Sequence, residues 1–288
     1  MAARIVGRLV VVMALVFAAL APARADEARS DNVVVDYVVP KTQKLVAVYE
    51  AAKESRMLEL MRLVFAPLRL PRPLTLRTTE CDGEVNAFYE DDVISVCYEY
   101  LGYIYELADR RSRPRGVSRR DAFLGTVLEV FLHEGAHAVF DMLRLPVLGR
   151  EEDAADQLAA LGLLSFEPEL SRNLVAGIVH MHLAEGGFRS PRQLGRRHIA
   201  LVDPRKDADE HSRPLQRMYS VTCLALGSKK PGFAEFATRV GLPPDRAEQC
   251  EDEYKQIVHA FRVLILPHVD PRWLTDLGGL DWYRPPAP

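Results

Sequence analysis

The amino-acid sequence predicts an α+β fold in which a small antiparallel sheet precedes a central helix and a mainly helical C-terminal half. Short β-rich runs occupy residues 33–39 and 74–96, and beyond residue 98 the apolar residues recur at helical spacing. A chain of 288 residues, of which 48% are hydrophobic, is long enough to bury a core. We therefore expect one large globular domain, or two tightly joined ones, over residues 26–288.

The sheet is expected from short segments that end at proline or at an acidic turn. Residues 33–39 are rich in valine and end at Pro40, and residues 42–66 have the helical spacing of a segment that covers the sheet. Residues 90–92 are all acidic, and they separate two β-rich runs as the turn of an antiparallel hairpin would. The further strands are expected at residues 74–79, 85–89 and 93–96.

The helical half follows a central helix over about residues 118–145, which Pro146 ends. The N-terminal α/β part of the domain is therefore expected over about residues 33–145, and the helical C-terminal part over about residues 150–270. The other helical segments are expected at residues 98–111, from about 150 onward, and at 168–185, 213–227, 231–240 and 244–265.

The central helix contains the sequence His133-Glu134-Gly135-Ala136-His137, which is an HExxH motif. Because an α-helix has about 3.6 residues per turn, His133 and His137 lie on one face and their imidazoles can hold one metal ion. Glu134 follows the first ligand and can take a proton from a metal-bound water, whose pKa zinc lowers toward neutrality. The alternative is a surface helix with chance polar residues, but the apolar neighbours favour a buried helix, in which unliganded His and Glu would be costly. The motif therefore predicts a site for one Zn²⁺ ion with Glu134 as the catalytic base.

A zinc site with two histidines needs a third protein ligand and an open position. The nearest supply is the acidic first turn of the helix that follows. Glu152 and Asp156 are four residues apart and share a face, so we assign Glu152 to the metal and Asp156 to a hydrogen bond that fixes the tautomer of His133. The competing interpretation is that these acidic residues bind no metal, because the helix dipole favours acidic residues in a first turn anyway. If the cluster does bind the metal, the ligand could instead be Glu151, Asp153 or Asp156.

His211 is a further candidate for catalysis. It follows Asp209 and Glu210 in a polar loop, and a carboxylate neighbour can keep an imidazole charged and correctly aimed. In a zinc hydrolase such a group can donate a hydrogen bond to the oxyanion of the tetrahedral intermediate. We therefore assign His211 this role as a hypothesis.

Residues 1–25 have the pattern of a secretory signal peptide. Two arginines precede an apolar run over residues 9–21, and residues 23–25 fit a small-residue cleavage site. The competing interpretation is an uncleaved membrane anchor, but the apolar run is shorter than the roughly 20 residues that span a bilayer. We expect an exported protein, periplasmic or secreted, whose mature chain begins at Asp26.

Export would place the four cysteines where disulfides persist. Two local bridges are the simplest arrangement. Cys81 with Cys97 would close a strand pair, and Cys223 with Cys250 would join two C-terminal helices. The other two pairings stay open. The cysteine spacings contain no CxxC, which argues against a zinc site with cysteine ligands.

Charge and hydropathy limit the classes of partner. The formal net charge of -3 makes nucleic acid an unexpected partner. No apolar stretch after the first 25 residues is long enough to cross a bilayer, so we expect no stable membrane span after signal cleavage. The oligomeric state does not follow from the sequence.

The order of these motifs resembles the gluzincin branch of the zincin metallopeptidases, the thermolysin-like group. HExxH is followed by Glu152-x-x-x-Asp156, which is similar to the ExxxD that gives this group its glutamate ligand and its supporting aspartate. The resemblance implies a zincin-like fold with the HExxH helix at its centre. Two departures are evident: the gap from His137 to Glu152 is shorter than in thermolysin, and the usual asparagine before the glutamate is absent.

The resemblance extends to substrate binding. Asn86 and Ala87, followed by two aromatic residues, resemble the edge strand with which thermolysin-like enzymes pair the substrate backbone. An extended peptide or protein segment would add there as an extra strand through main-chain hydrogen bonds. The competing interpretation is an interior hairpin strand that binds no substrate. His211 lies where this group has a histidine that stabilises the transition state.

The chain also resembles a family of exported bacterial proteins known only as "putative metallopeptidases". The shared features are the Asn-Ala-aromatic segment, the Cys97-Tyr98-Glu99 segment and the Asp-Glu-His loop, and the similarity spans most of the mature chain. Two alternatives to a protease remain. One is an exported zinc-containing binding or scaffold protein, which a closed site with four protein ligands would indicate. The other is a metal-dependent amidase that acts on cell-envelope material.

Overall fold

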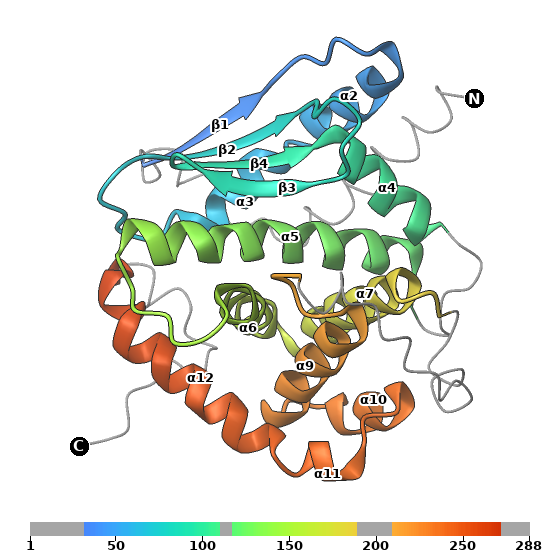
Figure 1. Cartoon of the computed structure of the whole chain (residues 1–288), viewed down its shortest axis with the longest axis vertical. Coiled ribbons are helices and arrows are strands. Elements are labelled where there is room, and N and C mark those ends of the chain that lie inside the picture. The colour runs from blue at the N-terminus through green and yellow to red at the C-terminus, as the bar shows by residue number, and fades with distance from the viewer. Residues whose placement is uncertain (1–31, 110–116, 189–208, 272–288) are drawn as a thin grey trace. The chain divides into compact units, whose positions relative to one another are not determined.

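The computed structural model describes residues 32–109, 117–188 and 209–271, which form two compact units (Figure 1). Within the described residues, the first unit comprises residues 32–106, 137–145 and 268–271, and the second comprises residues 107–109, 117–136, 146–188 and 209–267. The boundary crosses the long helix α5 (Arg119–Met142) between Ala136 and His137. The predicted signal peptide, residues 1–25, lies outside the described residues.

A four-stranded mixed sheet in the order β1-β2-β4-β3 forms the first unit (Figure 1). β1 pairs parallel with β2, β2 pairs parallel with β4, and β3 pairs antiparallel with β4. The predicted hairpin is confirmed, but the prediction of a wholly antiparallel sheet is wrong. Helices connect β1 to β2, and such a crossover is the connection that parallel neighbours require. The strands are β1 (Val33–Tyr37), β2 (Leu74–Thr79), β3 (Ala87–Glu90) and β4 (Val93–Cys97).

The crossover consists of η1 (Gln43–Leu45), α2 (Val46–Glu54) and α3 (Met57–Phe65). The sequence predicted one helix over residues 42–66, but Arg56 adopts a left-handed conformation with φ of 54° and separates α2 from α3. α3 packs against β1 and β2. The Tyr37 hydroxyl accepts the backbone N–H of Leu58 at 2.8 Å, and so satisfies a donor that the start of a helix leaves without an internal partner.

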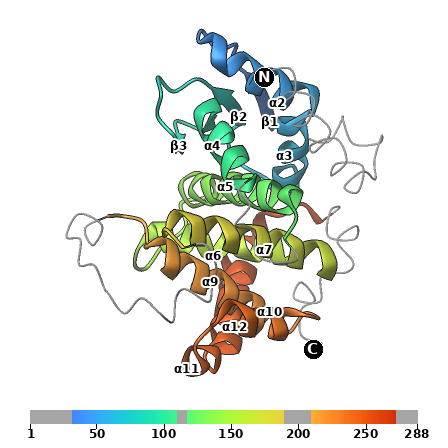
Figure 2. The same cartoon turned by 90° about the vertical axis from the view of Figure 1, so that its right-hand side faces the viewer.

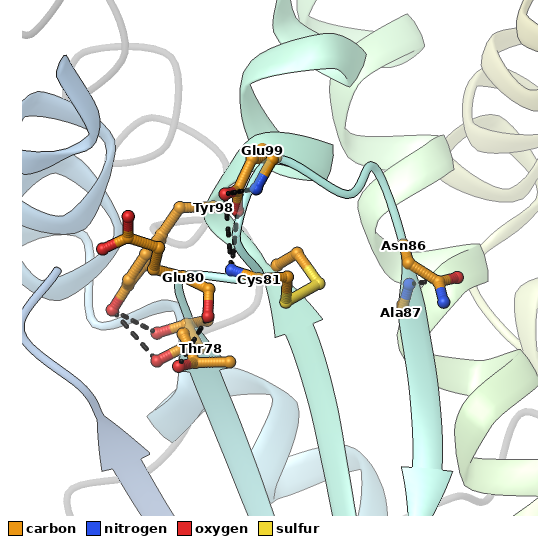
Figure 3. Close-up of a disulfide and its surroundings, with 10 residues drawn as sticks. Thr78, Glu80, Cys81, Asn86, Ala87, Tyr98 and Glu99 are labelled. Carbon is orange, nitrogen blue, oxygen red and sulfur yellow. Dashed lines mark hydrogen bonds between the residues drawn. A yellow bond between two sulfur atoms is a disulfide. The ribbon is translucent and has the colours of Figure 1, made fainter. Parts of the chain in front are cut away.

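Three consecutive residues, Cys97, Tyr98 and Glu99, hold the loop that connects β2 to the edge strand β3 (Figure 3). Cys97 forms a disulfide with Cys81. The buried Tyr98 hydroxyl lies 3.0 Å from the carbonyl oxygen of Thr78. The Glu99 carboxylate accepts the backbone N–H of Cys81 at 3.1 Å and that of Gly83 at 2.9 Å. The Cys-Tyr-Glu segment, which joins β4 to α4 (Tyr98–Ala108), therefore anchors the end of β2 and the loop that follows it.

The second unit is helical and contains the segment of α5 before His137 together with the helices that follow. Figure 2 shows α6, α7 and α9 side by side, and α9 packs against α7 and α12. A disulfide between Cys223 and Cys250 ties α9 to α12, so both local cysteine pairs are bonded. The helices are α6 (Glu151–Leu164), α7 (Pro168–Glu185), α9 (Pro214–Gly227), α10 (Phe233–Val240), α11 (Pro244–Ala247) and α12 (Cys250–Leu264).

Two glycines let the backbones of α5 and α7 touch. A Cβ atom at Gly125 of α5 would lie 2.3 Å from the carbonyl oxygen of Leu174, and one at Gly177 of α7 would lie 2.1 Å from that of Asp121. Both distances are too short for any side chain, so this close approach depends on glycine in both helices. Among the described residues, no helix combines the length and the apolar character of a membrane span.

Replacing Gly177 with Ala is expected to lower the free energy of unfolding by about 1–3 kcal/mol. The added methyl group overlaps the Asp121 carbonyl oxygen, and this overpacking outweighs a gain in helix propensity of up to about 1 kcal/mol. Urea denaturation followed by circular dichroism measures the difference. Gly102→Ala in α4 is the matched control, because a Cβ there meets no atom within 4 Å. Wild-type stability of Gly177→Ala would contradict the close approach of α5 and α7.

Candidate metal centre

Three side chains of the second unit converge as a group that could hold a metal ion. They are His133 of α5, Glu152 of α6 and His211 of the loop before α9, and their ligand atoms lie within 4.8 Å of one another. Glu152 Oε2 lies 2.9 Å from Nε2 of His133 and 2.9 Å from Nε2 of His211. Atoms bound tetrahedrally at about 2.1 Å from one zinc ion are about 3.4 Å apart. The donor types and their spacing therefore fit a single zinc ion after small shifts.

His133 is oriented by a second contact. Its side chain is buried, and Nδ1 lies 2.8 Å from Asp156 Oδ1. Because Asp156 engages Nδ1, Nε2 is the ring nitrogen that faces Glu152. Burial disfavours the charged imidazole, but the hydrogen bonds to Asp156 and Glu152 outweigh burial and raise the pKa of His133 to about 10. A metal ion that binds Nε2 of His133 would have to displace the proton from that nitrogen.

The four acidic residues in the first two turns of α6 have different surroundings. Glu152 joins the three-residue group, and Asp156, one turn later, reaches His133. Asp153 accepts a hydrogen bond from the Ser212 hydroxyl at 2.6 Å, and Glu151 is exposed. The four-residue spacing thus places two carboxylates on the face of α6 that lies toward His133.

The loop that carries His211 is tied to the start of α6. Ser212 donates to Asp153, and the Arg150 guanidinium donates to the carbonyl oxygen of Asp209. The backbone N–H of His211 donates to the Asp209 carboxylate at 2.9 Å. The side chain of His211 is 51% exposed, and its ring stacks on that of His133 with centroids 5.9 Å apart. Contacts with the start of α6 and one contact within the loop therefore hold His211 next to the imidazole of His133.

Two charged residues of this region had not been identified from the sequence. Arg217 of α9 donates to both carboxylate oxygens of Asp156, each at 2.7 Å, and to Glu129 Oε1 at 2.8 Å. Burial would raise the pKa of Asp156, but the hydrogen bond with His133 and the charge of Arg217 hold it below its usual range. The sequence offers one signal for Glu129: it lies between Leu128 and Val130 in an apolar helix, where a charged residue needs a partner.

The remaining predicted residues lie in both units. Glu134 follows His133 on α5 and is buried. His137 belongs to the first unit and lies one helical turn after His133 on the same helix. Asn86 and Ala87 also belong to the first unit, where Ala87 begins the outermost strand β3. The Ala87 N–H donates to the Asn86 side chain at 3.0 Å (Figure 3).

The edge strand is connected to the end of α5 within the first unit. The Tyr89 hydroxyl of β3 donates to Asp141 Oδ2 at 2.8 Å, and Asp141 lies four residues after His137 on α5. Arg72 contacts Asp141 at 3.2 Å and both carboxylate oxygens of Asp92 at 2.7 Å. These contacts fix the C-terminal end of β3 against the helix turn that follows His137.

Comparison with protein-family models matches residues 37–265 to a family described as "Putative metallopeptidase". The matched region includes the HExxH motif, the acidic start of α6, the His211 loop and the edge strand. Neither the curated proteins nor the solved structures contain a match to the chain.

Proposed function

Because the chain belongs to the family described as "Putative metallopeptidase", we propose that it is a zinc-dependent peptide hydrolase. The observation that carries this proposal is that His133, the first histidine of the HExxH motif, converges with Glu152 and His211. Nitrogen and carboxylate donors without cysteine are typical of catalytic zinc sites. All four cysteines are engaged in disulfides, so they are not competing ligands.

In this proposal His133, His137 and Glu152 hold one zinc ion. Nε2 of His133 and Oε2 of Glu152 lie 2.9 Å apart, so a small shift would bring them to the spacing of two zinc ligands. Helical geometry puts His137 on the face of α5 that carries His133. When bound, zinc supplies a Lewis acid that lowers the pKa of water and polarises a scissile carbonyl group. The three residues leave one coordination position open for those oxygen atoms.

The chain's own residues then move the proton and stabilise the developing charge. Glu134 takes a proton from the attacking water and passes it to the leaving amine of the peptide. The imidazole N–H of His211 donates a hydrogen bond to the carbonyl oxygen of the scissile peptide bond, which becomes negative during the reaction. Asp156 keeps His133 in one tautomer through the hydrogen bond at 2.8 Å.

We propose that the substrate is a peptide or an extended protein segment that pairs with β3. Among the described residues, β3 pairs with one strand, β4, and stands at the end of the sheet. Its outer edge could therefore pair with an added strand from a substrate. Asn86 and Ala87 stand at the start of this edge, and the Cys81–Cys97 disulfide and Glu99 hold the loop before them. An edge held in this way would bind an extended chain with little loss of conformational entropy.

We also propose that the protein works outside the cytoplasm, in the periplasm or as a secreted protein. Two disulfides support this location, because such bonds persist mainly in oxidising compartments. The predicted signal peptide points the same way.

One observation favours a second candidate function. His211 Nε2 lies as close to Glu152 Oε2 as His133 Nε2 does, at 2.9 Å. If His211 bound the metal together with the three proposed ligands, the site would have four protein ligands and no open position. The protein would then be an exported binding or scaffold protein that uses zinc for stability.

Glu134→Gln is expected to leave zinc binding unchanged and to reduce peptide hydrolysis at least about 100-fold, because the amide cannot accept the proton of water. Zinc content is measured by atomic emission, and turnover is measured on fluorescently labelled casein and on a peptide library. Wild-type turnover in this variant would contradict the mechanism. A zinc-loaded wild-type protein without turnover on either substrate would favour the scaffold function.

Glu152→Ala is expected to weaken zinc affinity about 10-fold or more, because it removes a ligand that contacts the ion directly. Competition with a chromophoric chelator measures the dissociation constant. Glu151→Ala is the matched control, since Glu151 precedes Glu152 on α6 and is exposed. Unchanged affinity in Glu152→Ala would move the ligand to another residue of the acidic turn, namely Glu151, Asp153 or Asp156.

A further inference from the structure

A series of hydrogen bonds connects three helices next to the candidate metal centre. It runs from His133 of α5 to Asp156 of α6 at 2.8 Å, and from Asp156 to Arg217 of α9 through two bonds of 2.7 Å. Arg217 then donates to Glu129 at 2.8 Å. Glu129 lies four residues before His133, so the series returns to the same face of α5 from which it started.

The shape of the arginine side chain matters in this series. A planar guanidinium can bind both oxygens of a carboxylate with two parallel N–H donors, which fixes the plane of the carboxylate as well as its position. Arg217 binds Asp156 in this way through Nε and one terminal nitrogen. The oxygen that faces His133 is therefore held by Arg217 in addition to the rotamer preference of Asp156.

Arg217, Asp156 and Glu129 lie in largely apolar surroundings, where each charge needs an oppositely charged partner. Arg217, Asp156 and Glu129 line a small pocket whose other walls are largely apolar and include Leu163 and Ile178. The side chains of Arg217 and Glu129 are only 19% and 10% exposed. Low polarity strengthens satisfied hydrogen bonds and makes an unpaired charge costly, so the three residues stabilise one arrangement together.

We propose that Arg217 is a positioning residue of the metal centre, which acts by holding Asp156 against His133 so that Nε2 is presented to the metal. This inference rests on the proposed zinc site. Arg217 acts on the metal site through Asp156, which it holds with two hydrogen bonds and which in turn contacts Nδ1 of His133. Its loss should therefore weaken metal binding in the way that loss of an outer supporting contact does.

The competing explanation is that Arg217 only stabilises the fold. Arg246 offers a matched control in the same unit, because it forms an ion pair with Glu253 at 2.5 Å and its side chain is 29% exposed. The variant Arg246→Met removes a partly buried arginine ion pair without changing any residue that contacts His133 or Asp156. Arg217→Lys keeps the charge but cannot reproduce the two parallel hydrogen bonds.

The test uses metal-free full-length mature protein and Zn²⁺ alone as the probe. Dissociation constants are measured by chelator competition, and thermal unfolding of the metal-free proteins is measured in parallel. Arg217→Met is expected to weaken zinc affinity about 10- to 100-fold, and Arg217→Lys about 3- to 10-fold. Arg246→Met is expected to lower the unfolding temperature but to keep zinc affinity within about twofold of the wild type.

The outcomes separate this inference from the proposed function. If the wild type binds zinc and the folded Arg217 variants bind it equally well, the positioning role is wrong and the zinc site stands. If Arg217→Met does not fold, the affinity of Arg217→Lys decides. If Arg246→Met weakens zinc binding as much as the Arg217 variants do, the effect is one of general stability and the inference is wrong. A wild-type chain that binds no zinc would overturn the metal centre and this inference with it.

Discussion

The candidate metal centre depends on the hydrogen bond between His133 Nδ1 and Asp156 Oδ1, which is 2.8 Å long. His133 lies on a buried segment of α5, where an imidazole without polar partners would be costly. Because Asp156 engages one ring nitrogen, the other faces Glu152. The orientation of this one ring decides whether side chains from a helix, a second helix and a loop can share one ion.

The packing of the second unit makes this contact possible. α6 supplies Glu152 and Asp156 from successive turns, and α9 begins three residues after His211. Gly125 allows α7 to approach the backbone of α5. The disulfide between α9 and α12 fixes the helix that follows the His211 loop. The chemistry of a few side chains thus relies on helix contacts that involve residues far from the site.

Features that depend on near neighbours could be predicted from the sequence. The buried motif helix, the one-turn spacing of Glu152 and Asp156 and the β3–β4 hairpin are of this kind. Parallel pairing of β2 with β1 and β4 was not predicted, because it depends on a crossover and on which strands become neighbours in space. Arg217 could not be paired from the sequence, since its partners are 61 and 88 residues away.

The proposal that one zinc ion joins His133, His137 and Glu152 is tested most directly by a crystal structure of the zinc-loaded protein with anomalous diffraction data at the zinc absorption edge. The account predicts one anomalous peak per chain, about 2.0–2.2 Å from His133 Nε2, from a nitrogen of His137 and from a carboxylate oxygen of Glu152, with a water molecule as the fourth ligand. A peak that lies elsewhere, or His133 and Glu152 still hydrogen-bonded to each other in crystals grown with excess zinc, would contradict it.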